Sequence, residues 1–232
     1  MMFYLNQLLW VIFPYVTLTA FVIGHIYRYN TDQIGWNAKS SEFLEKKSLR
    51  LGSILFHVGI IMVFGGHVVG LLVPKSVLVS LGVSEEMYHL SAVAVGGFAG
   101  IITFIGMMIL LFRRVGNKRV RKTSSVSDIL IAALLFLEIG LGLYNALGPN
   151  LISGEFDYRV TIAPWLRGLL ALTPDPALMT DVPLIFKLHT LFGFAIFGIW
   201  PFTRLVHVWS LPLEYLKRSF IIYRKAGRIK SS

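Results

Sequence analysis

Four histidines lie on two apolar stretches of this sequence, at spacings that suit the ligands of a bound group. His57 and His67 are ten residues apart within FHVGIIMVFGGHVVG, which otherwise contains only apolar residues and glycine. His189 and His207 are eighteen residues apart, near the two ends of a second apolar stretch. Because a titratable side chain is costly in an apolar environment, these imidazoles are candidates for binding a metal or cofactor.

Helix geometry places these histidines at two levels. At about 1.5 Å per residue, ten residues rise about 15 Å, and eighteen residues rise about 27 Å in five full turns. In two antiparallel helices His57 shares a level with His207. His67 then shares a level with His189, and helix tilt must absorb the difference of about 12 Å between the two rises. Two facing imidazoles at each level are what a six-coordinate haem iron binds, so the sequence predicts two bis-histidine haem b groups.

Other bound groups fit this pattern less well. Zinc prefers tetrahedral sites of Cys, His or carboxylate, but the chain has no cysteine, and no carboxylate lies within one turn of these histidines in the sequence. A histidine pathway for protons or a metal ion stays open as an alternative. Nearby glycines favour either the close approach of a flat macrocycle or close helix packing. These glycines are Gly59, Gly65, Gly66, Gly70 and Gly193.

The surrounding sequence is that of a membrane protein. Of 232 residues, 55% are hydrophobic and only 15% are charged, whereas about a quarter of a soluble domain is charged. A transmembrane helix needs about 20 mostly apolar residues. Five stretches meet this length, and they are residues 3–26, 51–73, 89–112, 126–147 and 182–206. The predicted fold class is therefore an all-α integral membrane protein, a bundle of five transmembrane helices in contact with membrane lipid.

The charges indicate how this bundle is oriented. Lysine and arginine are concentrated in the first and third connections and after the fifth span, while the second connection has Lys75 beside Glu85 and Glu86. Basic residues mark the cytoplasmic side, so we expect the N-terminus outside and the C-terminus in the cytoplasm. The basic residues behind the net charge of +10 either set the topology alone or also dock a cytoplasmic partner or hold anionic groups. No nucleic acid partner is expected. The predicted organisation is a membrane domain, 1–208, and a cytoplasmic tail, 209–232.

The fourth connection, about 35 residues long, contains the apolar segment VTIAPWLRGLLALTP. This segment predicts either a helix lying in the membrane interface or a loop with an apolar underside.

Two motifs carry a resemblance to a known family. FHVG…GGH and KLH…PFTRLVHVWSLP, with their spacings of ten and eighteen residues, resemble the gamma subunit of respiratory nitrate reductase, and the likeness covers nearly the whole chain. That family is a dihaem cytochrome b in the cell membrane. The resemblance implies a quinol-oxidising subunit of a nitrate reductase (quinone) complex, whose substrate is menaquinol or ubiquinol. It also implies two partners, an iron–sulfur beta subunit and a molybdenum-containing alpha subunit that reduces nitrate.

The resemblance also assigns roles to the histidines. His67 and His189 match the ligands of the outer, distal haem, beside which quinol is oxidised. His57 and His207 match the ligands of the inner, proximal haem, from which electrons leave to the iron–sulfur subunit.

The quinol pocket is expected at the outer level, where its candidates are Gly66, Gly70, His89 and Lys187. Family members carry a lysine near the start of the third span, but this sequence reads SEEMYHL, with Met87 near that position. The departure leaves His89 or Glu85 to supply polar contacts to quinol.

Arginine pairs well with carboxylates, so Arg204 and Arg28 are candidates for contacts with the haem propionates near the cytoplasmic level, and Arg113 and Arg114 lie at the same level. Snorkelling to the interface is the alternative for these arginines. Within the fourth span, Glu138 is expected to make a local hydrogen bond instead of serving as a proton route.

Two rival functions remain open at this stage. One is a dihaem membrane subunit of another cytoplasmic reductase, such as one of sulfur metabolism. The other is a histidine-based transporter of protons or metal ions.

Overall fold

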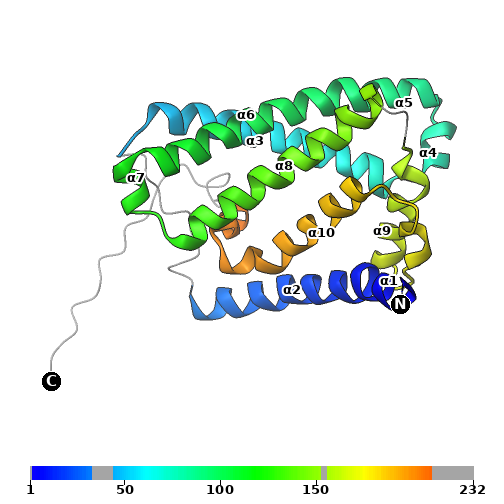
Figure 1. Cartoon of the computed structure of the whole chain (residues 1–232), viewed down its shortest axis with the longest axis horizontal. Helices are drawn as coiled ribbons and strands as arrows, with labels where there is room; N and C mark the ends of the chain where they lie inside the picture. The colour runs from blue at the N-terminus through cyan, green and yellow to red at the C-terminus, as the bar shows by residue number, and fades with distance from the viewer. Residues whose placement is uncertain (1, 33–43, 153–155, 211–232) are drawn as a thin grey trace, which may run out of the picture.

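The computed structural model describes residues 2–32, 44–152 and 156–210. Across these residues the chain is entirely helical outside its turns, and five of its helices are long and apolar enough to cross a membrane. In Figure 1 the five helices run side by side along the longest axis of the molecule. The predicted class, a five-helix membrane bundle, is confirmed.

Three of the five long helices are built from consecutive segments, some of them short π-helical turns. Their bounds are α1 (Met2–Gln7), η1 (Leu8–Ile12) and α2 (Phe13–Thr31) for the first; α3 (Lys47–His67) and η2 (Val68–Leu72) for the second; α5 (Glu85–Ser91), η3 (Ala92–Gly96) and α6 (Gly97–Gly116) for the third; α8 (Val126–Ile152) for the fourth; and α10 (Leu184–Ile199) for the fifth.

Short helices connect the long ones or follow the last of them. They are α4 (Lys75–Ser80), α7 (Lys118–Lys122), η4 (Tyr158–Val160), α9 (Ile162–Leu170), η5 (Pro176–Met179), η6 (Trp200–Phe202) and η7 (Arg204–Ser210). In Figure 1, α4, α5 and α9 lie at one end and α7 lies at the other. We refer to these as the α9 end and the α7 end.

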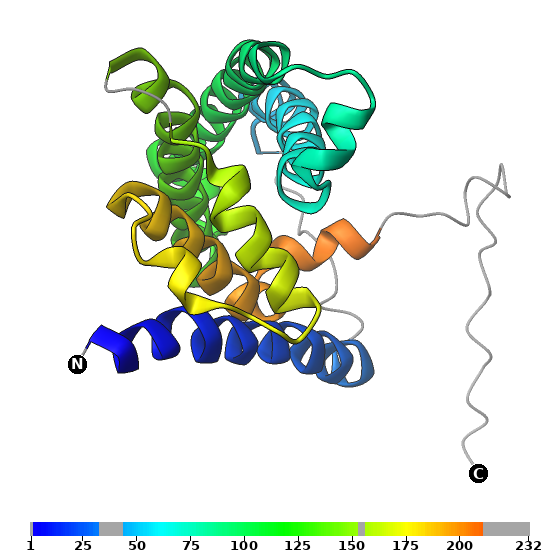
Figure 2. The ribbon, with the colours of Figure 1, turned by 90° about the vertical axis from the view of Figure 1, so that its right-hand side faces the viewer.

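The long helices pack in a fixed order. α3 packs on α6, α6 on α8, α8 on α10, and α10 on α2. α3 and α10 are therefore separated by two intervening helices in this series, and within the described residues they are not close-packed neighbours. Figure 2 shows this arrangement along the bundle.

Glycine allows α3 and α6 to approach closely. A Cβ added at Gly106 would lie 2.8 Å from the Cα of Phe56, and one added at Gly59 would lie 2.8 Å from the backbone nitrogen of Thr103. Such distances are closer than side chains tolerate, so the two helices meet backbone to backbone. The Thr103 hydroxyl donates a hydrogen bond to Ala99 O within α6, at 2.6 Å.

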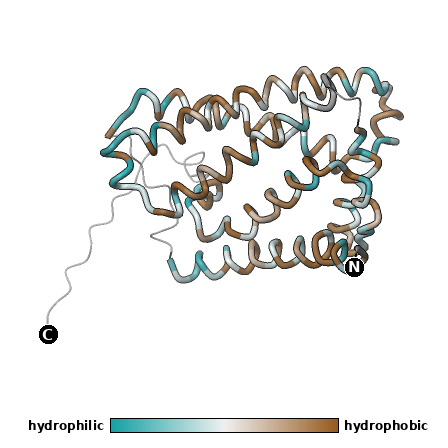
Figure 3. Tube along the Cα trace, in the orientation of Figure 1, coloured by the Kyte–Doolittle hydropathy of each residue, from teal (hydrophilic) through white to brown (hydrophobic). Residues whose placement is uncertain are grey.

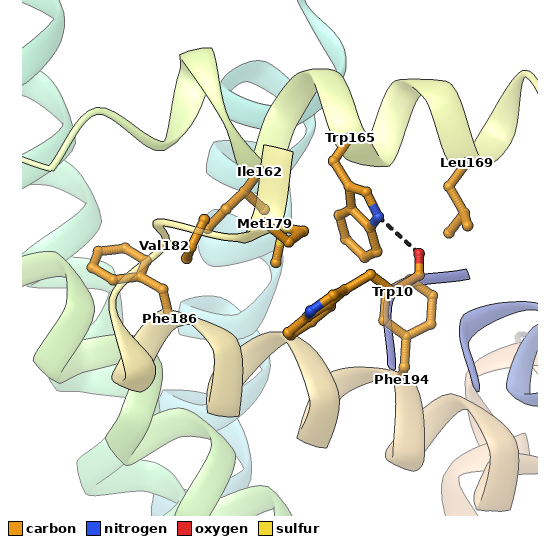
Figure 4. Close-up of a cluster of buried hydrophobic side chains, with 8 residues drawn as sticks. All are labelled: Trp10, Ile162, Trp165, Leu169, Met179, Val182, Phe186 and Phe194. Atoms are coloured by element: carbon orange, nitrogen blue, oxygen red, sulfur yellow. Dashed lines mark hydrogen bonds between the residues drawn. The ribbon is translucent and has the colours of Figure 1, made fainter. Parts of the chain in front are cut away.

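The apolar segment of the fourth connection forms a helix, α9, and not a loop. α9 covers the α9 end with a cluster of buried side chains drawn in Figure 4: Trp10, Ile162, Trp165, Leu169, Met179, Val182, Phe186 and Phe194. Trp165 Nε1 donates a hydrogen bond to Trp10 O, at 2.9 Å. The cluster therefore links the first helix, the fourth connection and α10.

Hydropathy follows the same plan. In Figure 3 the long helices are mostly hydrophobic, and hydrophilic residues gather at the two ends. Many large apolar side chains on the long helices face outward, including Ile12, Val22 and Phe98. Such outward apolar surface is what lipid solvates, so this is a multi-pass membrane protein.

The prediction of one continuous helix over 182–206 is wrong at its C-terminal end. α10 ends at Ile199, and the backbone is extended at Thr203, with φ −118° and ψ 178°. The cause is Pro201, which lacks an N–H and clashes with the preceding turn. Arg28 Nη1 donates to the freed carbonyls of Pro201 and Thr203, at 2.5 and 2.9 Å.

The rise of about 27 Å expected for a regular helix of eighteen residues therefore does not apply to this chain. Instead, the segment after α10 turns away from the helix axis toward α3, as the orange ribbon in Figure 2 shows. This turn places the ring of His207 against that of His57 on α3.

Candidate cofactor site

The structure brings the four histidines together as two facing pairs. The ring centroids of His57 on α3 and His207 on η7 are 6.1 Å apart, with the rings inclined at 76°. Those of His67 on α3 and His189 on α10 are also 6.1 Å apart, with the rings at 43°. These are the two pairs that the helix levels predicted from the sequence.

The separation within each pair suits a shared metal ion. A metal bound by an imidazole lies about 2 Å from the ligating nitrogen, and the ring centroid lies about 1 Å behind that nitrogen. Two imidazoles on opposite sides of one ion thus have centroids about 6 Å apart. The residues therefore fit a bis-histidine iron at both levels.

The hydrogen bonds of three histidines favour the same chemistry. Their Nδ1 atoms lie against backbone carbonyls, which only accept, so Nδ1 carries the proton and Nε2 keeps its lone pair for a metal. The acceptors are Ser53 O for His57 at 2.7 Å, Val63 O for His67 at 2.8 Å and Arg204 O for His207 at 2.7 Å.

His189 differs in its Nδ1 partner. Its Nδ1 lies 2.9 Å from Glu138 Oε1 on α8, and the Glu138 side chain is 15% exposed. A Cβ at Gly142 would lie 2.9 Å from His189 Cε1, so that glycine makes room for the ring. The sequence indicated a local hydrogen bond for Glu138 but did not identify His189 as its partner. It also did not indicate a role for Gly142, although Glu138 and Gly142 lie one turn apart on α8.

The glycines near the histidines have different surroundings. Gly59 contacts α6, and a Cβ at Gly70 would lie 2.6 Å from the hydroxyl oxygen of Tyr158. Added Cβ atoms at Gly65 and Gly66 would meet nothing within 4 Å. Only these two glycines, next to His67, leave open space for a flat group.

Arg28 and Arg204, two of the arginines predicted to contact haem propionates, make polar contacts with other residues near the His57–His207 pair. Arg28 donates to the two carbonyls at the break after α10. Arg204 Nη1 lies 3.8 Å from Asp128 Oδ1, and Arg114 Nη1 lies 3.6 Å from Asp128 Oδ2. Arg204 therefore sits beside a carboxylate while its own carbonyl orients His207.

Arg113 has a different role. It is buried and pairs with Glu45 at 2.7 Å, which fixes the start of α3 to the end of α6.

The candidates for the quinol pocket lie toward the α9 end. His89 is half-buried on α5, and Lys187 Nζ donates to Thr180 O at 2.8 Å. Sequence reasoning missed a pair of tyrosines there, because their contact joins residues 70 positions apart. The hydroxyls of Tyr88 and Tyr158 are 2.7 Å apart, beside Gly70.

Charged side chains surround this tyrosine pair. Arg159 pairs with Asp157 at 2.9 Å and with Glu85, and its guanidinium lies 4.0 Å from the centroid of the Tyr88 ring. Lys75 lies 3.1 Å from Glu85 and 3.2 Å from Asp157. We call Lys75, Glu85, Asp157 and Arg159 the outer ion cluster. It joins the second connection to the fourth.

Fold and site together define a multi-pass helical membrane protein with two facing histidine pairs between its helices. Residues 6–226 match the family model described as nitrate reductase gamma subunit. The chain belongs to the nitrate reductase gamma subunit family, and it is thus a membrane subunit of a nitrate reductase complex, an oxidoreductase with further subunits.

Several known proteins resemble the chain over its length. It is 54% identical over 220 residues to the nitrate reductase gamma chain of Bacillus subtilis, covering 95% of this chain and 98% of that one. It is 37% identical over 227 residues to the respiratory nitrate reductase 2 gamma chain of Escherichia coli, with 95% and 97% covered. The nitrate reductase-like protein NarX of Mycobacterium tuberculosis is 40% identical over 221 residues, which are 95% of this chain and 34% of NarX.

Proposed function

We propose that this chain is the quinol-oxidising, dihaem cytochrome b subunit of a membrane-bound nitrate reductase. The observation that carries the proposal is the presence of two histidine pairs, each with ring centroids 6.1 Å apart. His57 and His207 would ligate the proximal haem, and His67 and His189 the distal haem. When bound, the two haems supply one-electron redox chemistry at two levels of the membrane.

The protein residues prepare these sites before any haem binds. Backbone carbonyls orient three of the four imidazoles, so each offers Nε2 as a neutral ligand. Arg204, with Arg28 nearby on α2, would offset the charge of haem propionates at the inner level.

We infer that the α7 end faces the cytoplasm and the α9 end faces outside. Support comes from α7, whose five residues include four basic ones, and from the arginines that precede it on α6. The α7 end would then meet an iron–sulfur beta subunit, followed by a molybdenum-containing alpha subunit. Residues 211–232, most of the predicted docking tail 209–232, lie outside the described residues.

Quinol, either menaquinol or ubiquinol, would bind at the α9 end. Gly66 would give the quinone ring access to α3, whereas Gly70, on η2, is covered by the hydroxyls of Tyr158 and Tyr88. His89 and Lys187 would contact the quinol oxygens. Quinol releases two protons as it is oxidised, so a pocket at this end would deliver them to the outside.

The test is the ligand pairing in the purified complex. His67→Ala and His189→Ala should each remove the same component of a potentiometric titration, while His57→Ala and His207→Ala should remove the other. His25→Ala is the control, because His25 lies outside both pairs, with its Nε2 accepting from Trp209.

Haem extraction from the parent should give two b haems per chain. A colourless parent protein would contradict the proposal and favour a transporter. Loss of different components from His67→Ala and His189→Ala would contradict the pairing. Copurification with a reductase that lacks molybdenum would favour a subunit of another enzyme.

A further inference from the structure

One of the four histidines has a charged partner where the other three have neutral ones. His57, His67 and His207 place Nδ1 on backbone carbonyls, whereas His189 places Nδ1 2.9 Å from the carboxylate of Glu138. We propose that Glu138 is a positioning residue, which acts through His189 to orient this ligand and lower the reduction potential of the iron that it binds. The inference rests on the proposed ligation of a haem by His67 and His189.

The surroundings of Glu138 show that this contact is built into the bundle. Glu138 lies in the middle of a membrane-crossing helix, and its second oxygen, Oε2, is buried and has no aligned hydrogen-bond partner among the described residues. A carboxylate in such a place is costly unless another group compensates for its lost hydration. His189 is the ionisable side chain that the structure places against it.

Two glycines make the contact possible. A Cβ at Gly193 on α10 would lie 3.2 Å from Glu138 Oε1, and a Cβ at Gly142 on α8 would lie 2.9 Å from His189 Cε1. A side chain at either position would push the carboxylate and the ring apart. The small residues thus belong to the Glu138–His189 pair, and Gly193 need not serve a macrocycle.

His189 Nδ1 and Glu138 Oε1 are in close contact, but the ring N–H is not aligned with the carboxylate oxygen. The distance of 2.9 Å is a hydrogen-bond distance, yet the ring N–H of His189 does not point squarely at the oxygen. The carboxylate therefore favours one ring orientation and one tautomer, with the proton on Nδ1 and the lone pair on Nε2.

The chemical consequence follows from the charge of the acceptor. A hydrogen bond to a carboxylate is roughly twice as strong as one to a neutral carbonyl. By drawing the Nδ1 proton toward itself, the carboxylate makes Nε2 a stronger electron donor. A stronger donor stabilises ferric over ferrous iron, so it lowers the reduction potential at the outer pair. The inner pair has only neutral partners, which are backbone carbonyls and the Ser53 hydroxyl, so it lacks this effect and provides an internal reference.

The experiment compares Glu138→Gln and Glu138→Leu with the parent in the purified complex. Gln keeps an acceptor without the charge, and Leu removes both. We expect the potential of the His67–His189 haem to rise in both variants. The rise should reach about tenfold in the reduction equilibrium for Leu, which is about 59 mV for a one-electron couple, and be smaller for Gln. The electron paramagnetic resonance signal of this ferric haem should also broaden in Glu138→Leu, while the His57–His207 haem stays unchanged.

The matched control is Asn145→Leu. Asn145 is a buried polar residue seven positions further along α8, and its side-chain amide has no aligned partner in the part of the chain that the structure describes. Its replacement should leave both potentials at their parent values. Unchanged potential and spectrum of the outer haem in both Glu138 variants would overturn the inference.

Loss of the outer haem alone in both Glu138 variants would support the positioning role. Loss of both haems, or of the folded complex, would assign Glu138 a general structural role and overturn it. A parent complex without a haem at the His67–His189 pair would instead refute the proposed function. The haem count of the parent therefore distinguishes failure of the proposed function from failure of the inference about Glu138.

Discussion

At the scale of single residues, the orienting hydrogen bonds do not depend on a bound metal. Three imidazoles have Nδ1 on a carbonyl of their own segment, four residues back for His57 and His67 and three for His207. A helix leaves no interior carbonyl unpaired, so each such bond is shared with the helix ladder and costs little extra order. The sites are therefore preorganised by local structure.

Two polar side chains near the outer pair should affect quinol oxidation. We predict that His89→Ala and Lys187→Ala each slow haem reduction by a quinol analogue about fivefold. Loss of one hydrogen bond to the substrate costs about 1 kcal/mol, which corresponds to that factor. Stopped-flow absorbance would measure the rate with both haems still bound.

The control for this prediction is Glu86→Ala, which changes an exposed residue in the first turn of α5. Reduction by a small artificial donor should be nearly unchanged in all three variants. If quinol-driven rates in His89→Ala and Lys187→Ala equal the parent rate, the pocket is formed by other groups, of which the hydroxyls of Tyr88 and Tyr158 are the nearest polar ones to Gly70.

At the scale of elements, the close contact between α3 and α6 holds both α3 histidines in position. We predict that Gly106→Ala destabilises the protein by about 1–3 kcal/mol, because the added methyl group meets the backbone of Phe56 and forces the helices apart. The melting temperature should fall by about 2–4 °C for each kcal/mol.

Gly96→Ala is the matched control, since a Cβ there meets nothing within 4 Å. It should leave the melting temperature unchanged or raise it slightly, as alanine favours helix. Equal stability of Gly106→Ala and Gly96→Ala would show that α3 and α6 are less tightly packed than described.

The outer ion cluster is the element-scale feature that should respond to pH. Burial raises the pKa of Asp157, but hydrogen bonds from Arg159 and Lys75 outweigh it, and the net pKa lies below its ordinary value. Hydrogen bonds to Glu85 and Asp157 raise the pKa of Lys75 above its ordinary value. A lowered carboxylate pKa contributes stability above the unfolded value of about 4, and a raised lysine pKa contributes it below about 10.5.

We therefore predict that the stabilising effect of Asp157 is constant between about pH 5 and 9 and disappears as the pH falls below about 4. Melting temperatures of the parent and of Asp157→Asn, compared across this range, would measure the effect. Asparagine retains an oxygen that can accept from the Arg159 backbone, so the local turn is preserved. A difference between the two proteins that did not decrease as the pH fell from 5 toward 3 would contradict the prediction.

These elements show what the sequence could and could not predict. The five helices follow from apolar length, and the pairing of His67 with His189 and of His57 with His207 follows from their order on antiparallel helices. The break at Pro201 was visible as WPFT, but the eighteen-residue spacing concealed it because it equals five regular turns. The Glu138–His189 contact depends on how α8 packs on α10, which no local pattern encodes.

At the scale of the whole molecule, the two ends of the bundle differ, as expected if electrons enter the protein near one end and leave it at the other. The α9 end is closed by a buried aromatic cluster and by the outer ion cluster. The α7 end has basic residues, four of them on α7. Under the proposed function, a substrate dissolved in the lipid would bind near the α9 end, and a protein partner would dock at the basic α7 end.

The C-terminal segment should therefore be needed for assembly and not for cofactor binding. We predict that truncation after Leu216 leaves both haems bound, because the last proposed ligand is His207, while the soluble nitrate reductase subunits detach from the membrane. The segment removed contains six basic residues and no acidic one, so its contribution to docking should weaken with salt. Nitrate reduction with a small artificial donor, measured in membrane and soluble fractions, would follow the detachment. Replacement of Lys75 by alanine, at the opposite end of the bundle, serves as the control and should keep the activity in the membrane fraction. If the truncated protein still retains the soluble subunits at high salt, partner binding must depend on α7 and the connections beside it.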